Sequence, residues 1–265
     1  MTTEAGDKIL RYAAITHRGR VRDGNEDAVF AVGAILRGDE DVRSGTVSFG
    51  RQGVFMIADG MGGHARGEIA SNHALEYLKT NINRFPSVDW EARILGANDE
   101  IFDLMARNLD FTGMGTTLVG AEISAVGTIF FNVGDSRAYR LVGGRLVKTS
   151  VDDVPKYAGA RTRTHEITQA LGGRPSRGRI FPHVSQEAPL EDDEQVLLCS
   201  DGLSDMVSEA VIYNILLKET DPSNAVRLLL QAALDAGGTD NISIISARLG
   251  PSCNQTNPGD AAGVI

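Results

Sequence analysis

Three β-prone segments follow one another closely between residues 117 and 142, and only short turns separate them. The segments are Thr117–Ile123, Gly127–Val133 and Ala138–Val142, with glycine at or beside each turn. Strands joined by such short turns are antiparallel neighbours, because a parallel crossover needs roughly a dozen residues or more. The arrangement therefore favours antiparallel sheets over a doubly wound parallel sheet.

Segments with helical periodicity occur as a consecutive pair and do not alternate with strands. Their apolar positions recur every three or four residues, and Pro86 separates the two segments. The first has Leu75, Leu78, Ile82 and Phe85, and the second has Trp90, Ile94, Ala97, Ile101 and Leu104. A further helix is expected to start at Asp221–Pro222 and to end at Gly237–Gly238. We therefore expect an α+β fold in which helices cover the outside of stacked antiparallel sheets.

Further segments have the composition of strands, and no long linker interrupts the chain. They are Leu10–Thr16, Ala28–Ile35, Val54–Ala58, Val196–Ser200 and Ile242–Leu249. A chain of 265 residues with 42% hydrophobic residues can bury a full core. We expect a single domain over residues 1–250 and a flexible polar tail over residues 251–265.

The charge and the cysteine content exclude several classes of protein. The formal net charge is −9, which argues against a nucleic-acid-binding protein because such proteins need a basic face. Cys199 and Cys253 are too few for a disulfide framework or a zinc set. No apolar stretch approaches the roughly 18 residues of a membrane span, and the N-terminus lacks the pattern of a signal peptide. We expect a cytoplasmic monomer that does not contact membranes.

A glycine-rich turn follows the strand-like segment Val54–Ala58. Residues 60–65 match the G-x-G-x-x-A spacing of a dinucleotide-binding turn. Three features weigh against that function: Asp59 would repel a pyrophosphate, no acidic residue ends a second strand about 20 positions later, and the region upstream is already rich in strands. An EF-hand is excluded as well, because the twelfth position counted from Asp59 is Ala70 and not glutamate.

Acidic residues stand at the ends of several strand-like segments. They are Glu26, Asp27, Asp59, Asp135, Asp201 and Asp240. Each one alone is most simply a turn residue, because aspartate and glycine dominate turns. Together they can meet in one cleft of a sandwich, where clustered carboxylates repel one another unless a cation lies between them. Oxygen ligands without cysteine or clustered histidine indicate Mg²⁺ or Mn²⁺ and not zinc.

Six motifs containing these residues follow one another along the chain. They are RVRDGNEDA (20–28), ADGMGGHARGE (58–68), GMGTTLVG (113–120), NVGDSRAYRL (132–141), LLCSDGLSD (197–205) and GGTDNISII (237–245). In this order they resemble the metal-dependent protein phosphatases, the type 2C serine/threonine phosphatases, over about residues 8–249. The glycine-rich motif with Met61 resembles the bacterial branch. The resemblance implies a four-layer αββα sandwich, in which helix pairs flank two antiparallel sheets.

The resemblance also implies a centre for two Mn²⁺ or Mg²⁺ ions and a substrate class. The implied ligands are Asp27, Asp59, Asp201, Asp240, the carbonyl of Gly60, Glu26 through water, and Asp135 for a third, weaker ion. Arg22 would grip the substrate phosphate, or alternatively form a surface ion pair. The ions would activate a bridging water that attacks phosphorus without a covalent intermediate. The substrates would be proteins carrying phosphoserine or phosphothreonine, in opposition to a serine/threonine kinase.

Two regions depart from the family pattern. Met61 stands where animal members have histidine, so the proton donor for the leaving group stays open between His64 and a metal-bound water. Residues 149–173 contain a shortened flap, which bears on the role of Asp135 and on substrate preference. Residues 156–179 carry six lysines and arginines against Glu166 alone. They form either a solvated loop or a positive rim that attracts acidic phosphoproteins.

Two other functions are weighed against the phosphatase. A haloacid-dehalogenase-type phosphohydrolase needs a D-x-D motif, and Asp59-Gly60-Met61 is not one. A catalytically silent binding module would have lost metal ligands, whereas every expected aspartate is present.

Overall fold

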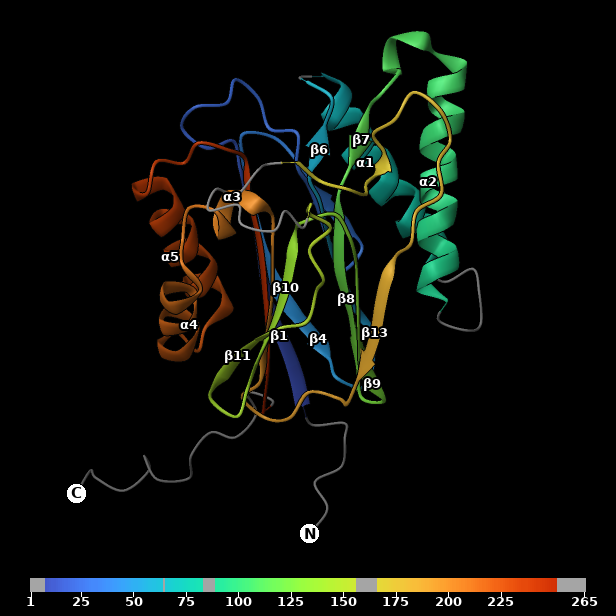
Figure 1. Cartoon of the computed structure of the whole chain (residues 1–265). Coiled ribbons are helices and arrows are strands. Elements are labelled where there is room, and N and C mark those ends of the chain that lie inside the picture. The colour runs from blue at the N-terminus through green and yellow to red at the C-terminus, as the bar shows by residue number, and fades with distance from the viewer. Residues whose placement is uncertain (1–7, 64, 83–88, 156–165, 252–265) are drawn as a thin grey trace, which may run out of the picture.

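Two antiparallel six-stranded sheets stack face to face, and helices cover their outer faces (Figure 1). The structure is a computed structural model that describes residues 8–63, 65–82, 89–155 and 166–251. This architecture confirms the α+β class and the four-layer αββα sandwich. Residues 252–265, which make up most of the expected tail, lie outside the described residues.

The first sheet joins the two ends of the described chain. In spatial order its strands are β11 (Arg145–Lys148), β10 (Arg137–Val142), β14 (Gln195–Cys199), β15 (Ile242–Pro251), β1 (Lys8–His17) and β4 (Glu40–Ser48). The pairing of β1 with β15 runs from Lys8 opposite Pro251 to His17 opposite Ile242. This long central pair ties the first and last strands together.

The second sheet contains two of the three consecutive strands predicted from short turns. In spatial order its strands are β13 (His183–Glu187), β9 (Gly127–Val133), β8 (Leu118–Ser124), β5 (Gly53–Ala58), β2 (Ala28–Ala31) and β3 (Ala34–Leu36). The two predicted strands are β8 and β9, which pair as an antiparallel hairpin. The expected pairing of the third strand with β9 was wrong, because the chain crosses after Val133 and the third strand is β10 of the first sheet, where it pairs with β14. A small third sheet consists of β12 (Leu171–Gly172), β7 (Gly115–Thr116) and β6 (Gly60–Met61). Since β6 follows directly after β5 and Asp59, the small sheet fixes the path of the glycine-rich turn.

Helices cover each sheet on the side that faces away from its partner. The helical elements are α1 (Ala65–Asn81), α2 (Trp90–Arg107), the 3₁₀ turn η2 (Leu109–Phe111), α3 (Asp201–Ser204), α4 (Glu209–Lys218) and α5 (Pro222–Asp235). Apolar residues of α1 and α2 pack on the second sheet, where Trp90 stacks on Phe131 with ring centroids 4.0 Å apart. Helices α3 to α5 pack on the first sheet in the same way. A third cluster, including Leu10, Phe55 and Phe130, fills the space between the sheets.

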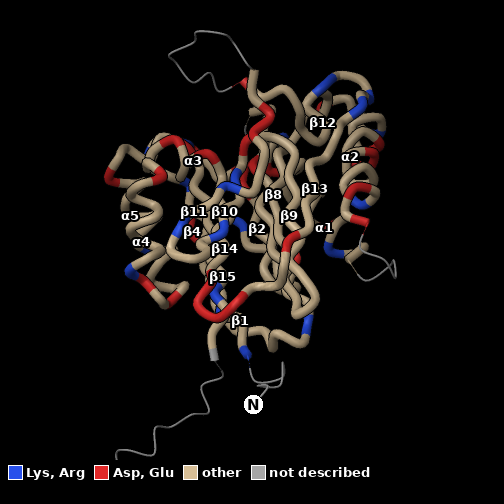
Figure 2. Tube along the Cα trace, turned by 60° about the horizontal axis from the view of Figure 1, so that its bottom comes forward, with Lys and Arg blue, Asp and Glu red and all other residues tan. Residues whose placement is uncertain are grey.

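Charged residues lie mostly outside this core. The inner strands of the second sheet are almost free of charged residues, whereas lysines, arginines, aspartates and glutamates lie on the helices, on the loops and on several strands of the first sheet (Figure 2). Burial of the apolar clusters contributes roughly 25 cal/mol for each Å² removed from water, which makes these layers the main source of stability. Within the described ranges, no helix has both the length and the apolar character needed to cross a membrane.

Several boundaries differ from the sequence-based expectation. The single strand expected over Ala28–Ile35 is a hairpin, because Val32 and Gly33 adopt φ of 44° and 86° and form a tight turn between β2 and β3. Strands β4, β11 and β13 lack the expected apolar pattern because they are edge strands with many exposed residues. Helix α1 begins at Ala65, well before Leu75. Phe85 and Pro86 lie outside the described residues.

Candidate metal centre

The acidic residues singled out in the sequence come together at one end of the sandwich, because antiparallel pairing places strand starts beside strand ends. Asp59 follows the last residue of β5, and the β2 start at Ala28 pairs with Ala58, so Asp27 and Asp59 are neighbours. Asp201 follows β14, while Asp240 precedes its partner β15. Asp135 lies in the turn between β9 and β10. Both sheets therefore supply carboxylates to the same edge.

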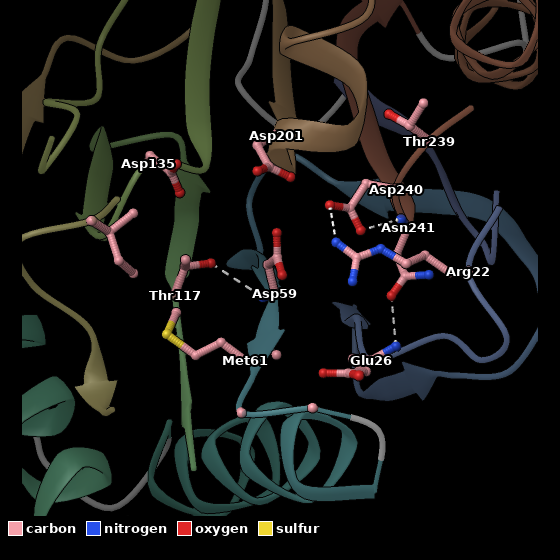
Figure 3. A pocket seen from close by; sticks show the side chains of 14 residues that line it. Arg22, Glu26, Asp59, Met61, Thr117, Asp135, Asp201, Thr239, Asp240 and Asn241 are labelled. Carbon is pink, nitrogen blue, oxygen red and sulfur yellow. Dashed lines mark hydrogen bonds and ion pairs between the residues drawn. The ribbon is translucent and has the colours of Figure 1, made fainter. Parts of the chain in front are cut away.

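These residues surround a pocket of about 460 Å³. Its charged lining consists of Arg22, Glu26, Asp59, Asp135, Asp201 and Asp240. In Figure 3 the carboxylate of Asp59 points to the middle of this group, with Asp201 above it and Arg22 beside it. No histidine or cysteine is among the described residues that line the pocket. Because Arg22 is the one positively charged side chain among these lining residues, the carboxylates of the pocket outnumber its cationic groups.

Two glycines let the chain segments approach closely enough to form the pocket. A Cβ on Gly60 would collide with the carbonyl oxygens of Gly67 and Glu26. A Cβ on Gly202 would collide with the carbonyl oxygen of Asn241. Because a backbone atom cannot move aside like a flexible side chain, any larger residue would push the start of α3 away from the start of β15. Gly202 thus keeps Asp201 close to Asp240.

Arg22 forms an ion pair with Asp240 inside the pocket. Its Nη2 donates to Asp240 Oδ2 at 2.6 Å, and the other oxygen, Oδ1, accepts from the backbone N–H of Asn241 at 2.8 Å. The hydrogen bond with Asp240 is the main cause of a raised Arg22 pKa. The Arg22 side chain is 53% exposed, so its guanidinium also remains accessible from solution.

Burial and mutual repulsion shape the acid–base behaviour of the carboxylates. Burial raises the pKa of Asp27 to about 7, and the charge of Asp240 adds to this. Burial and the charge of Asp135 raise the pKa of Asp201 to about 8. Burial, followed by the charge of Asp27, raises the pKa of Asp59 well above its ordinary value. Burial also raises the pKa of Asp135, and Asp205 adds to it.

Divalent cations would compensate the buried, unpaired carboxylate oxygens of this cluster. Both carboxylate oxygens of Asp27 and Oδ1 of Asp201 are buried without a hydrogen-bond partner among the described residues. A buried carboxylate oxygen without a donor is costly, and a hard cation relieves both this cost and the repulsion between neighbours. Over the described ranges, no three His, Cys, Asp or Glu side chains lie in positions that could hold a metal ion as they stand, so the carboxylates would have to move closer together to bind one. The donor set, made of oxygens alone, fits Mg²⁺ or Mn²⁺.

Most of the predicted site residues meet at this pocket. Arg22, Glu26, Asp59, Gly60, Asp135, Asp201 and Asp240 all line the pocket. Asp27 is 1% exposed and lies behind the lining, next to Asp59. His64, a possible proton donor, lies outside the described residues. Met61, at the position where the sequence departs from the family pattern, lines the pocket.

The basic segment 156–179 is described from residue 166 onwards, and its arginines contact the protein. Arg177 pairs with Asp99 at 3.2 Å and with Asp103 at 2.5 Å, both on α2. Arg174 donates to the carbonyl of Thr168. Lys156, Arg161 and Arg163 lie outside the described residues. The positive rim therefore stays a prediction, and Arg177 contributes to holding this segment on α2.

Two polar residues organise the pocket although sequence reasoning gave them no role. Asn241 Oδ1 accepts from the N–H of Glu26, and its Nδ2 donates to the carbonyls of Arg18 and Gly24. These bonds fasten the loop that carries Arg22 and Glu26 to the start of β15. The Thr117 hydroxyl accepts from the N–H of Asp59 at 3.2 Å. Asn241 lies in the motif of residues 237–245 and Thr117 in the motif of residues 113–120. Their place inside these motifs is the feature of the sequence that could have indicated a role in the site.

Comparison with known proteins agrees with this geometry. The model of the family described as Protein phosphatase 2C matches residues 41–234. The serine/threonine protein phosphatase PstP of Mycobacterium tuberculosis is 31% identical over 255 residues, which cover 90% of this chain and 45% of that protein. The chain thus spans about half the length of this relative. The serine/threonine phosphatase stp of Listeria innocua is 30% identical over 247 residues, covering 87% of this chain and 92% of that protein.

Solved structures show the same similarity in three dimensions. The crystal structure of the PstP catalytic domain in complex with two manganese ions has a TM-score of 0.74 at 30% identity, and the match covers 92% of this chain and 99% of that one. A further structure of the M. tuberculosis phosphatase has a TM-score of 0.75 at 31% identity, covering 91% of this chain and 99% of that one.

Proposed function

The chain belongs to the protein phosphatase 2C family, and we propose that it is a metal-dependent protein-serine/threonine phosphatase. It hydrolyses phosphoserine and phosphothreonine by attack of water on phosphorus, without a covalent phosphoenzyme. The observation that carries this proposal is the single pocket in which Asp59, Asp201 and Asp240 meet with Arg22. Unmet carboxylate oxygens favour divalent cations there, and the cation–arginine combination favours a phosphate as ligand.

We assign the ions to the predicted carboxylates. Two Mn²⁺ or Mg²⁺ ions would be held by Asp27, Asp59, Asp201, Asp240 and the carbonyl of Gly60, with Glu26 acting through water. The buried and unpartnered oxygens of Asp27 and Asp201 support this assignment. Two manganese ions in the PstP catalytic domain support the number and the kind of ion. Asp135, on the far side of Asp59 from Arg22 in Figure 3, would hold a third ion.

Each group in the pocket has a separate task in hydrolysis. The carboxylates would hold divalent ions, which would lower the pKa of a bound water and neutralise charge on the phosphoryl group. The guanidinium of Arg22 orients the phosphate, because its planar fork of N–H donors matches phosphate oxygens. Asp240 holds that guanidinium at the pocket mouth through its 2.6 Å hydrogen bond. The Asn241 bonds keep the Arg22 loop in register with the carboxylates.

The substrates follow from the reaction. A phosphatase of this family acts on phosphoproteins, and its phosphoserine and phosphothreonine substrates are products of a serine/threonine kinase, which it would oppose. We further propose that residues 1–250 form the catalytic domain and that it acts as a monomer in the cytoplasm.

Release of phosphate from a phosphothreonine peptide tests the proposed function. Activity should be present with Mn²⁺, disappear when EDTA removes the ion, and return when excess Mn²⁺ is added. The same peptide with phosphotyrosine should be a poor substrate. Hydrolysis that persists in EDTA, or accumulation of an acid-stable phospho-aspartate on the protein, would contradict the proposed mechanism.

Replacement of Arg22 by alanine should lower kcat/KM for a phosphopeptide by roughly 10- to 100-fold, because hydrogen bonds to a charged group contribute about 1.5–3 kcal/mol. Most of the change should lie in KM. Arg20 provides a matched control, since its side chain is 54% exposed and pairs with Asp235 at 3.4 Å, outside the pocket. Arg20→Ala should leave the kinetic constants near those of the wild type. Equal constants for both variants would favour the surface ion pair alternative for Arg22.

A further inference from the structure

Residues 149–153, which we call the strap, lie along the turn that carries Asp135. The backbone N–H of Thr149 donates to the carbonyl of Ala138, and the Ser150 hydroxyl accepts from the N–H of Ala138. The Val151 backbone exchanges two hydrogen bonds with the side-chain amide of Asn132. The strap is thereby bonded to both strands that flank the β9–β10 turn.

Two adjacent aspartates of the strap hold this turn at its two ends. Asp153 Oδ2 accepts from the backbone N–H of Gly134 at 2.9 Å, and the Asp153 N–H donates back to the Gly134 carbonyl. Asp152 Oδ2 accepts from Nε and Nη2 of Arg137 at 3.0 and 2.8 Å. Gly134 and Arg137 lie immediately before and two residues after Asp135. The position of the Asp135 carboxylate therefore depends on the strap.

Asp153 also binds a second segment of the chain that borders the pocket. Its second oxygen, Oδ1, accepts from Gln169 Nε2 at 2.8 Å and from His183 Nε2 at 2.9 Å. Its carbonyl accepts from the N–H of Thr168, the neighbour of the pocket residue Ile167. With 7% exposure, Asp153 is a buried junction between the Asp135 turn, the segment around Ile167 and strand β13.

We propose that Asp153 is a positioning residue for the metal centre: through Gly134 it sets the location of Asp135, and through Thr168 and Gln169 it sets the pocket wall at Ile167. The inference rests on the proposed function, because it treats Asp135 as a cation ligand. Asp153 is not among the residues that line the pocket. Its contribution is to keep one carboxylate of the pocket in a fixed place, as outer hydrogen-bond partners do for metal ligands in general.

Asparagine at position 153 isolates this contribution. The carboxylate accepts on both oxygens, whereas an amide of the same shape offers one accepting oxygen and one donating NH₂ group. In Asp153→Asn, the new NH₂ group must face either the Gly134 N–H or the two donors of Gln169 and His183. One of these hydrogen bonds to residue 153 is therefore lost whichever way the amide turns. His183→Gln is the conservative partner variant, because glutamine retains a side-chain N–H donor. It should behave like the wild type.

The test is a double-mutant cycle on the full chain with Asp153→Asn, Asp135→Asn and both together. Mn²⁺ binding is measured by isothermal titration calorimetry, and kcat/KM is measured on a phosphothreonine peptide. Asp153→Asn should weaken the weakest Mn²⁺ site by about tenfold or more, in the range seen for outer-shell partners. In the Asp135→Asn background the same change should have little further effect on Mn²⁺ binding, because the route through Gly134 then has no carboxylate to position.

Glu194→Gln controls for the loss of a buried carboxylate elsewhere in the sandwich. Glu194 is 8% exposed and accepts hydrogen bonds from Arg140, outside the pocket lining. This variant should lose stability but retain Mn²⁺ affinity. The positioning role would be overturned if the effects of Asp153→Asn and Asp135→Asn on the free energy of Mn²⁺ binding simply added. It would also be overturned if Asp153→Asn left the Mn²⁺ affinity unchanged. A wild-type protein without Mn²⁺-dependent phosphatase activity would instead overturn the proposed function.

Discussion

Replacement of Asp59 by asparagine should lower kcat for phosphopeptide hydrolysis by roughly a thousandfold or more, the rate equivalent of about 4 kcal/mol of transition-state stabilisation. Asp59 is central to the cluster, because four other carboxylates act on it electrostatically. After burial, the charges that raise the pKa of Asp59 are those of Asp27, Asp201, Asp240 and Asp135. Loss of this one charge should therefore weaken the hold on both ions of the core site.

Steady-state kinetics at limiting and saturating Mn²⁺ measure this effect. Excess Mn²⁺ should restore only part of the lost turnover, because the ligand geometry is changed as well as the affinity. Asp192→Asn is the control, because it also removes one carboxylate charge but does so outside the pocket. Asp192 is 60% exposed and pairs with Lys8 at the start of β1, so this variant should keep full activity. Near-normal turnover of Asp59→Asn at limiting Mn²⁺ would remove Asp59 from the proposed site.

Without divalent ions, the free energy of unfolding should fall as the pH rises from about 4 to about 8. In the folded protein the pKa of Asp27 is about 7 and that of Asp201 about 8, against an ordinary value of 3.8. Between these values the folded state binds more protons than the unfolded state, so stability is present at low pH and is lost as the pH rises. The loss should amount to several kcal/mol, because each unit by which folding raises a pKa corresponds to about 1.36 kcal/mol.

Thermal melting in EDTA across this pH range, repeated with Mn²⁺, measures the effect. Mn²⁺ should raise the melting temperature most at the alkaline end, where the carboxylates carry the most uncompensated charge. Asp201→Asn should melt higher than the wild type in EDTA at pH 8, by roughly 2–4 °C for each kcal/mol of relieved repulsion. It should also gain less from Mn²⁺. A wild-type melting temperature that rises with pH in EDTA would show that burial and mutual repulsion of these carboxylates do not destabilise the folded protein.

The placement of the carboxylates was predictable because each one adjoins an apolar strand. Asp59 and Asp201 directly follow segments that any sandwich would bury, and antiparallel pairing brings Asp240 and Asp27 beside them. The hairpin at Val32–Gly33 was missed because its flanking segments are both apolar and carry no break in the pattern. Edge strand β4 was missed because its exposed residues hide the alternation on which strand prediction depends.

The polar junctions could not be predicted from the sequence. Asn241 bonds to Arg18 and Gly24, more than 200 positions away, and this contact depends on β15 pairing with β1. Asp153 meets His183 because β13 pairs with β9, which precedes the strap. Such contacts result from sheet order, and single residues such as asparagine and aspartate carry no periodic signal that would reveal them.

All pocket residues lie at one edge of the sandwich, and the β8–β9 hairpin turns at the other. Val126, at the tip of this hairpin, is 87% exposed, and its strands run from there to Thr117 and Asp135. A cysteine introduced at Val126, in a chain whose Cys253 is replaced by serine, should therefore serve as an anchor for a glass slide or a chromatography resin. Immobilised by this residue, the protein would present its catalytic edge to the solution and keep the turnover of the unattached enzyme.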